Sequence, residues 1–142
     1  MKYVDASAVL RVLFREPGPA APLAAGETIV SSALVEVEAF RAIDRARLLG
    51  HLDDRQTAVK LKELADLVAM LDLAPIDRTV IDRAKDSFAV PVRALDAIHV
   101  ATAELLVVEG VAVEFWTHDD RQRLAALARG LSVHGLDQPA RR

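Results

Sequence analysis

The chain has 142 residues, 52% of them hydrophobic and 27% charged, which is typical of one globular domain with a sizeable core. It contains no cysteine, and this excludes disulfides, zinc–thiolate sites, iron–sulfur clusters and thiol nucleophiles. The formal net charge of −3 argues against binding nucleic acid through bulk positive charge, although most of the basic residues are arginine and leave room for a local phosphate-binding rim.

Short apolar runs alternate with helical segments along the chain. The clearest helix covers residues 53–71, where Leu61, Leu64 and Leu67 recur near helical spacing, and we expect it to form a hairpin with the preceding helix. In chain order we predict a strand over 2–4, a helix over 8–14 capped by Ser7, a small alanine-rich helix after Pro19, a strand over 28–31, helices over 33–49 and 53–71, a strand over 73–76, helices over 79–88 and 94–109, a strand over 113–116, a helix over 119–129 and a strand over 131–133.

Strands that alternate with helices predict right-handed crossovers and a mainly parallel sheet covered on both faces, which is a three-layer α/β/α fold. We predict a single domain over residues 1–137 and a flexible tail over residues 138–142. The N-terminal segment lacks the long apolar region of a secretory signal, and no apolar run is long enough to cross a bilayer. We therefore expect a cytoplasmic protein.

Three acids lie where predicted strands give way to helices. Asp5 ends the first strand, Asp96 lies in the first turn of its helix, and Asp119 follows the strand near Thr117. Ligands of open parallel sheets bind at the carboxyl ends of the strands, and Glu38, in the helix after the second strand, can reach the same edge. Four carboxylates repel one another unless a cation neutralises them, and oxygen ligands favour Mg²⁺ or Mn²⁺. The chemistry indicated is phosphodiester hydrolysis.

Each acid also has a purely structural interpretation. Asp5, Asp96 and Asp119 lie near helix starts, where a carboxylate caps free amides or interacts with the helix dipole. Glu38 can pair with Arg41 on the surface of one helix. The four residues taken one at a time leave both interpretations open.

Four local strings resemble the PIN-domain family and, within it, the VapC-type toxins of bacterial toxin–antitoxin pairs. They are VDASA from residue 4, SALVEVEAFR from residue 32, LDAIHVATA from residue 95 and FWTHDD from residue 115. They occur in the family's order and span residues 4–120, whereas residues 50–90 match only in their helical character. By this resemblance the family's metal-site acids correspond to Asp5, Glu38, Asp96 and Asp119, with Glu36 and Asp120 as alternatives for the second and the fourth.

The resemblance implies a five-stranded parallel sheet, a site for Mg²⁺ or Mn²⁺, endonucleolytic cleavage of RNA by an activated water, and inhibition by a cognate VapB-like antitoxin. A groove between the first helices would receive an amphipathic helix of that antitoxin. We also expect a homodimer, because the apolar face of the 53–71 helix can serve either as core or as a subunit interface.

Several other polar residues are secondary candidates. Ser7 and Thr117 can bind metal-held water or substrate, and Arg41 and Arg45, four residues apart on one helix face, can bind phosphate. Helix caps and surface ion pairs are the structural alternatives. His99 follows Asp96 by three residues on one helical face, and we predict a structural or orienting role for it.

Two other functions remain open. A noncatalytic α/β interaction module would need only the fold, and another metal-dependent phosphohydrolase would use the same acid cluster. A receiver domain is disfavoured because the chain lacks paired acids at the first strand and a lysine near the last. Nucleotide binding and zinc hydrolysis are disfavoured because no glycine-rich loop follows a strand and no HxH or HExxH spacing occurs.

Overall fold

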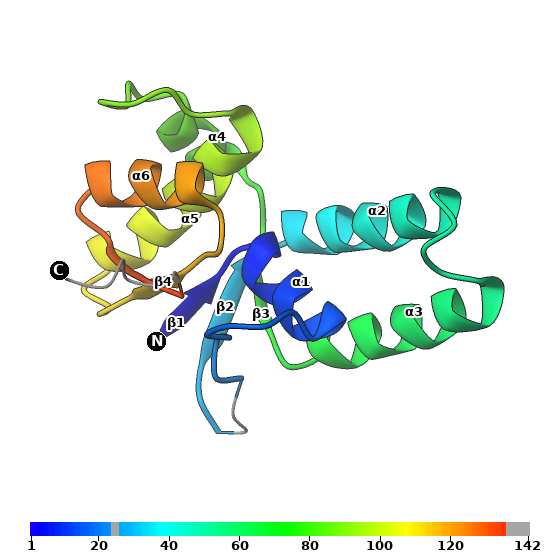
Figure 1. The fold of residues 1–142 in the computed structure, drawn as a ribbon. Coiled ribbons are helices and arrows are strands. Elements are labelled where there is room, and N and C mark those ends of the chain that lie inside the picture. Colours follow the sequence, from blue (N-terminus) through cyan, green and yellow to red (C-terminus); the bar gives the residue numbers. More distant parts are fainter. Residues whose placement is uncertain (24–25, 136–142) are drawn as a thin grey trace, which may run out of the picture.

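Five strands form one sheet in which every neighbouring pair is parallel, in the order β3-β2-β1-β4-β5. The computed structural model describes residues 1–23 and 26–135. The strands are β1 (Lys2–Val4), β2 (Ile29–Ser32), β3 (Asp72–Ala74), β4 (Glu114–Trp116) and β5 (Ser132–His134). This architecture confirms the predicted α/β class and the five-stranded parallel sheet (Figure 1).

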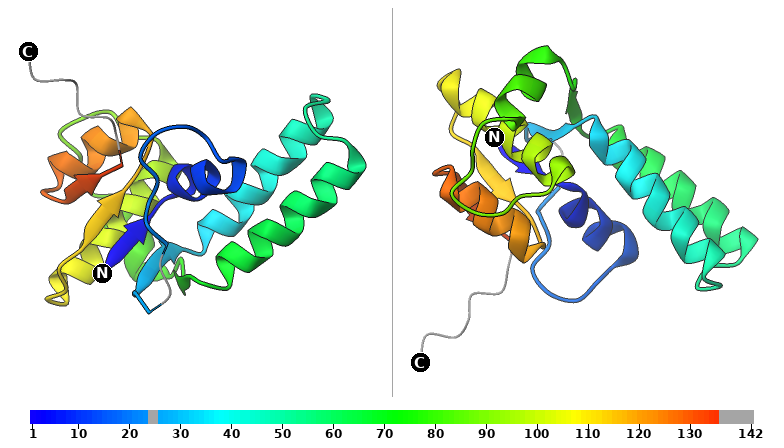
Figure 2. Two further views of the ribbon diagram at one scale, coloured as in Figure 1. Left: turned by 60° about the horizontal axis from the view of Figure 1, so that its bottom comes forward. Right: turned by 90° about the horizontal axis from the view of Figure 1, so that it is seen from above.

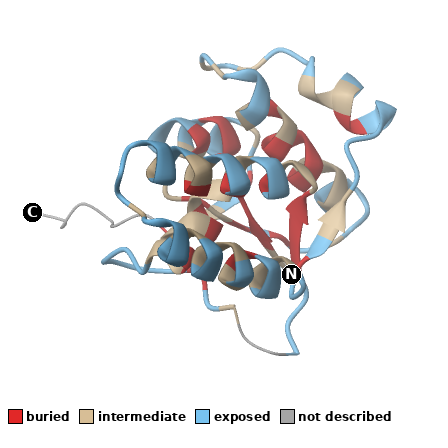
Figure 3. Cartoon of the chain, turned by 90° about the vertical axis from the view of Figure 1, so that its right-hand side faces the viewer, coloured by how far each residue is buried: buried red, intermediate tan, exposed pale blue. Residues whose placement is uncertain are grey.

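Helices cover both faces of the sheet, so the predicted three layers are present (Figures 1 and 2). On one face lie α1 (Ala6–Phe14), α2 (Leu34–Leu48) and α3 (Asp54–Val68). On the other lie α5 (Ala94–Val108) and α6 (Asp120–Ala128), and α4 (Arg78–Ala84) packs against α5. The alternation of side chains along β1 divides the core between the faces. Val4 packs with Val35 on the α1–α3 side, and Tyr3 packs with Phe115 on the α5–α6 side. Most of β1 and all of β2 are accordingly buried in the centre of the molecule, whereas the edge strands β3 and β5 are more exposed (Figure 3).

The hairpin of α2 and α3 extends away from the sheet, with the two helices side by side (Figure 2). A capping box starts α3: the Asp53 side chain accepts from the Gln56 amide, and the Gln56 side chain accepts from the Asp53 amide. Leu64 is buried and Leu61 and Leu67 pack beside it in the core. The apolar face of this helix therefore contributes to the core of the protein itself.

Two details of the predicted N-terminal region are wrong. No helix follows Pro19 up to residue 23, because Pro22 has no amide hydrogen to donate and Ala21 is drawn into the core as irregular chain. Asp5, and not Ser7, caps α1: the Asp5 carboxylate accepts from the Ala8 amide at 2.9 Å, and Ser7 lies inside the helix.

Most other predicted boundaries differ from the structure by one to three residues, but the helix over 79–88 ends at Ala84. The chain turns there so that Phe88 packs against the α5–α6 core, under the guanidinium group of Arg129 at 4.1 Å from the ring centre. The predicted tail over 138–142 lies outside the described residues. Among residues 1–23 and 26–135, no helix has the length and apolar character needed to span a membrane.

The crossover from β3 to β4 moves the chain from one face of the sheet to the other. Helices that connect β1, β2 and β3 lie on one face, whereas those that follow β3 lie on the other. The strand order therefore reverses between β1 and β4, and their carboxyl ends flank the topological switch point, where open parallel sheets bind their ligands. Asp5 follows one of these strands and Asp119 follows the other.

Candidate active site

Asp5 is held in one orientation at the end of β1. The residue is only 3% exposed. One oxygen accepts hydrogen bonds from the Ala8 amide at 2.9 Å and the Ser7 hydroxyl at 2.7 Å, and the other accepts from the Thr117 hydroxyl at 2.6 Å. Burial raises the pKa of the Asp5 carboxyl, while His99 and the hydrogen bonds from Thr117, Ser7 and the Ala8 amide act in the opposite direction.

Ser7 and Thr117 tie the ends of β1 and β4 together around Asp5. The Asp5 amide donates to the Trp116 carbonyl at 3.2 Å, and the His118 amide donates to the Ser7 hydroxyl at 2.7 Å. The two hydroxyl oxygens lie 3.3 Å apart. Both predicted secondary residues are thus at the site, where they contact the Asp5 carboxylate.

The structure brings Asp96 close to the other three predicted acids. Asp96 lies in the first turn of α5 and is half-buried. Burial is the largest cause that raises the pKa of its carboxyl, and the negative charge of Asp119 comes next, with smaller contributions from Asp5 and Glu38. His99 acts in the opposite direction. The charges of all three acids therefore reach Asp96, so four carboxylates from four parts of the chain share one region of the molecule.

Glu38 faces α5, and Glu36 does not share this position. Oε2 of Glu38 lies 2.7 Å from Nε2 of His99, and the Glu38 side chain is 21% exposed. Glu36, two residues earlier on α2, is exposed to solvent. Nδ1 of His99 lies 2.8 Å from the Tyr3 hydroxyl, so a hydrogen-bonded chain runs from β1 through α5 to α2.

Asp119 caps α6, and its neighbour Asp120 points to solvent. The Asp119 carboxylate accepts from the Arg121 amide at 2.8 Å and from the Gln122 amide at 3.3 Å, and its own amide donates to the Thr117 hydroxyl at 3.1 Å. The Asp120 side chain is 80% exposed and pairs with Arg123. Only Asp119 of this pair influences Asp96.

The predicted phosphate-binding arginines lie on the outer surface of α2. Arg41 and Arg45 are both exposed, and the Arg41 guanidinium pairs with Asp44 at 2.9 Å. They lie three and seven residues after Glu38 on its helix. Both arginines therefore follow Glu38 on the same helix, and their side chains are exposed to solvent.

The donor set of the four acids suits a hard divalent cation. All of its ligand atoms are carboxylate oxygens, as Mg²⁺ and Mn²⁺ prefer, and the acids raise the pKa of Asp96 as uncompensated like charges do. Within the described residues, no three Asp, Glu or His side chains are gathered closely enough to hold an ion as they stand. A cation between the carboxylates would offset the repulsion among their charges.

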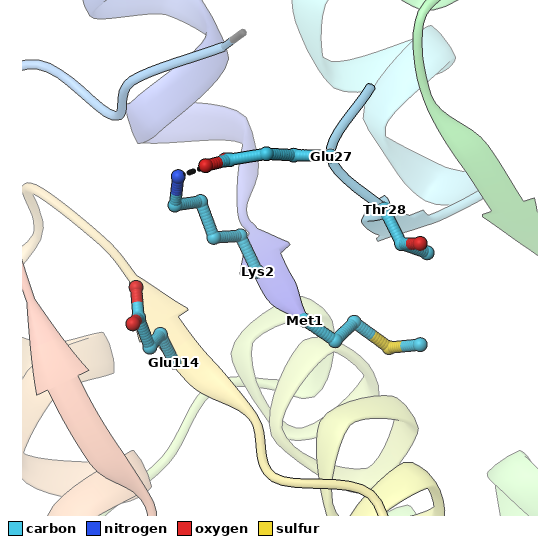
Figure 4. A pocket seen from close by; sticks show the side chains of 5 residues that line it. All are labelled: Met1, Lys2, Glu27, Thr28 and Glu114. Carbon is cyan, nitrogen blue, oxygen red and sulfur yellow. Dashed lines mark hydrogen bonds and ion pairs between the residues drawn. The ribbon is translucent and has the colours of Figure 1, made fainter. Parts of the chain in front are cut away.

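A separate cavity of about 330 Å³ lies at the amino ends of the strands, away from the acids (Figure 4). Residues from β1, β4, the chain start and the loop before β2 line it: Met1, Lys2, Glu27, Thr28 and Glu114. Lys2 pairs with Glu27 in its wall. Because ligands of parallel sheets bind at the carboxyl ends, this cavity is not the expected active site.

Comparison with known proteins identifies the family of the chain. The sequence matches the PIN-domain family over residues 2–128, which is most of the chain. The chain belongs to the PIN-domain family. It is also 37% identical over 134 residues to a protein named Ribonuclease VapC46 from Mycobacterium tuberculosis, and the match covers 92% of this chain and 94% of that relative. Both findings confirm the resemblance to PIN-domain proteins of the VapC type.

One component of this PIN-domain site was not predicted from the sequence. Tyr3 was identified only as a strand residue, yet its hydroxyl group contacts His99 and accepts from the Ser32 amide at 3.2 Å. The available signal was its place two residues before Asp5 on the same strand, together with the spacing of His99 three residues after Asp96. That spacing places His99 near the acids, but it does not reveal its partners.

Proposed function

We propose that this chain is a Mg²⁺- or Mn²⁺-dependent endoribonuclease that acts as the toxin of a toxin–antitoxin pair. The observation that carries the proposal is the convergence of Asp5, Glu38, Asp96 and Asp119 on the switch point between β1 and β4 of a PIN domain. The VapC-type relative, which is matched along nearly its whole length, supports ribonuclease activity over a noncatalytic role.

The four acids would hold the ion, and each contributes differently. The bound ion would supply positive charge to the scissile phosphate and acidify the attacking water. Asp5 is preorganised, since three donors fix both of its oxygens. Asp96 takes up a proton more readily than an ordinary Asp, so a proton and the ion would compete for it. Arg41 and Arg45 would position RNA phosphates beside the acids.

The proposed partners are RNA and a VapB-like antitoxin, and the proposed location is the cytoplasm. Exposed apolar side chains on α2, among them Val37 and Phe40, support a protein partner for this helix, because such residues rarely gather on a surface that only water contacts. A groove of about 320 Å³ between α1 and α3, lined in part by Val12, Leu67 and Met70, offers apolar side chains against which the antitoxin would pack.

We also propose a homodimer, and sedimentation of the isolated chain tests this proposal.

The test of activity compares wild type with Asp96→Asn and Glu36→Gln on a mixture of structured RNAs. Each protein is incubated with Mg²⁺, with Mn²⁺ and with a chelator. We expect wild type and Glu36→Gln to cleave in the presence of either metal, and Asp96→Asn to be inactive, because Glu36 is exposed and Asp96 is at the centre of the acids. Equal cleavage by all three proteins would indicate a contaminating nuclease. Absence of cleavage and of metal binding in wild type would favour the interaction module.

A further inference from the structure

We propose that His99 is a positioning residue that, together with Tyr3, holds the Glu38 carboxylate in the acid cluster. This inference rests on the proposed metal-dependent activity and assigns a role to two residues that bind neither metal nor RNA in it. The three side chains come from β1, α5 and α2 and are joined by two hydrogen bonds of 2.8 and 2.7 Å.

The hydrogen-bond roles in this chain are consistent with one arrangement of protons. The Tyr3 oxygen accepts from the Ser32 amide at 3.2 Å, and its hydroxyl proton can donate to Nδ1 of His99 at 2.8 Å. In that arrangement the Nε2–H of His99 donates to Oε2 of Glu38 at 2.7 Å. Tyr3 therefore links the backbone of β2 to the imidazole that contacts Glu38.

Packing allows the imidazole little freedom to turn away. Tyr3 is 0% exposed and His99 is 1% exposed. The edge of one ring meets the other, with 6.0 Å between their centres and 78° between their planes, and the far side of Tyr3 stacks on Phe115 at 5.2 Å. A rotation of the imidazole would break its hydrogen bonds to Tyr3 and Glu38 and leave a buried ring nitrogen without a partner, which is costly.

The location of the chain connects it to the proposed metal ligands. Tyr3 lies two residues before Asp5 on β1, and His99 lies three residues after Asp96 on α5. Glu38 comes from another element, α2. The hydrogen bond from His99 connects its carboxylate to α5, and groups that fix a ligating carboxylate in this way tune its affinity for the metal.

An imidazole Nε2–H suits this position because it orients the carboxylate through a single hydrogen bond. The bond engages Oε2, and a carboxylate has a second oxygen with which to bind a metal.

The experiment measures Mn²⁺ affinity in the absence of RNA, with electron paramagnetic resonance to determine the concentration of free Mn²⁺. The variants are His99→Leu, which removes the donor, and His99→Gln, whose amide can place a donor near the position of Nε2. We expect His99→Leu to weaken Mn²⁺ binding by about tenfold or more and His99→Gln to restore most of the affinity. Asp53→Ala, which loses the exposed cap of α3, is the control for a loss of stability alone, and its Mn²⁺ affinity should equal that of wild type.

Two further measurements keep the test decisive. Tyr3→Phe removes only the hydroxyl, so it serves if His99→Leu does not fold, and it should also weaken Mn²⁺ binding. Nitrogen NMR of the metal-free wild type should show a proton on Nε2 of His99, and an Nε2 without a proton would overturn the inference. Wild-type Mn²⁺ affinity in folded His99→Leu, or in Tyr3→Phe, would also overturn it.

Asp96→Asn, measured in parallel, separates this inference from the proposed function. If Asp96→Asn binds Mn²⁺ as wild type does, the proposed metal site itself is wrong. If Asp96→Asn loses binding while His99→Leu and Tyr3→Phe retain it, the metal site stands and only the positioning role fails.

Discussion

Replacement of Asp96 by asparagine should make the protein more stable at neutral pH while it removes metal binding. The substitution preserves the shape of the side chain and removes its charge. Burial and the charge of Asp119 raise the pKa of the Asp96 carboxyl, so the ionised form present at neutral pH is less favourable in the folded protein than in the unfolded chain. Asparagine does not carry this penalty.

The size of the gain follows from two opposing contributions. Water screens part of the repulsion, because Asp96 is only half-buried. The substitution also removes a carboxylate from the first turn of α5, where the helix dipole favours it by about 0.3–1 kcal/mol. We expect a net increase of about 0.5–1 kcal/mol in the free energy of unfolding at pH 7, which corresponds to a rise in Tm of about 1–4 °C for a chain of this length.

The gain should depend on pH in a direction fixed by the raised pKa. The stability that wild type derives from protonating Asp96 is fully present below the ordinary Asp value of 3.8 and is lost as the pH rises through the folded-state pKa. The advantage of asparagine should therefore be greatest near pH 7 and disappear on acidification toward that value. Urea unfolding of both proteins at several pH values measures it, and the difference between the proteins cancels the other groups that titrate.

Added Mg²⁺ should reverse the order of the two proteins. An ion that binds only folded wild type adds about 2.7 kcal/mol at a concentration of 100 times its Kd, whereas Asp96→Asn should gain little. The matched control is Asp120→Asn, since that side chain is 80% exposed and paired with Arg123, and we expect neither the gain nor the loss of metal response. Lower stability of Asp96→Asn at pH 7, or a gain that is equal at every pH, would refute the reasoning.

Four further predictions test the remaining assignments. Asp5→Ala should lose about 1–3 kcal/mol in urea unfolding, because it leaves three donors without an acceptor, whereas Asp5→Asn should lose less and both should be inactive. Glu38→Gln should abolish RNA cleavage while Glu36→Gln retains it. The opposite result would assign Glu36, and not Glu38, to the acid site. Arg45→Ala should raise KM for RNA and reduce its salt dependence with kcat unchanged, and a fall in kcat alone would contradict a binding role. Asp53→Ala should cost about 0.5–2 kcal/mol of stability without changing cleavage. It is the control that shows whether a loss of stability by itself reduces activity.

The order and type of the elements were predictable because they depend on local patterns. Apolar runs of strand length alternate with helical periodicity along the whole chain, and that alternation was sufficient to predict the parallel sheet with helices on both faces. The irregular segment after Pro19 was not predictable in this way. Its alanines favour a helix, and only the tertiary contact of Ala21 with the core shows that this local preference is overridden.

The acids of the candidate site could be proposed from the sequence, but the hydrogen bonds that hold their side chains could not. Family resemblance could assign Asp5 and Asp96, because each lies in a specific local string. The link between Tyr3, His99 and Glu38 joins residues 96 and 61 positions apart in the sequence. Such a contact depends on how α5 and α2 pack across the sheet, and neither composition nor periodicity along one element contains that information.

The structural and the functional interpretations of these acids turn out to be compatible. Asp5 caps α1 and Asp119 caps α6, as the structural interpretation expects, and both lie at the switch point of the sheet. The two roles coincide because a parallel sheet places the ends of its strands and the starts of the following helices along one edge. A carboxylate there satisfies backbone amides with one part of its hydrogen-bonding capacity and retains its negative charge for a cation. Capping by an acid at this edge therefore does not count against a metal-binding role, and only the loss of metal response in Asp96→Asn, which caps no helix, separates the two interpretations cleanly.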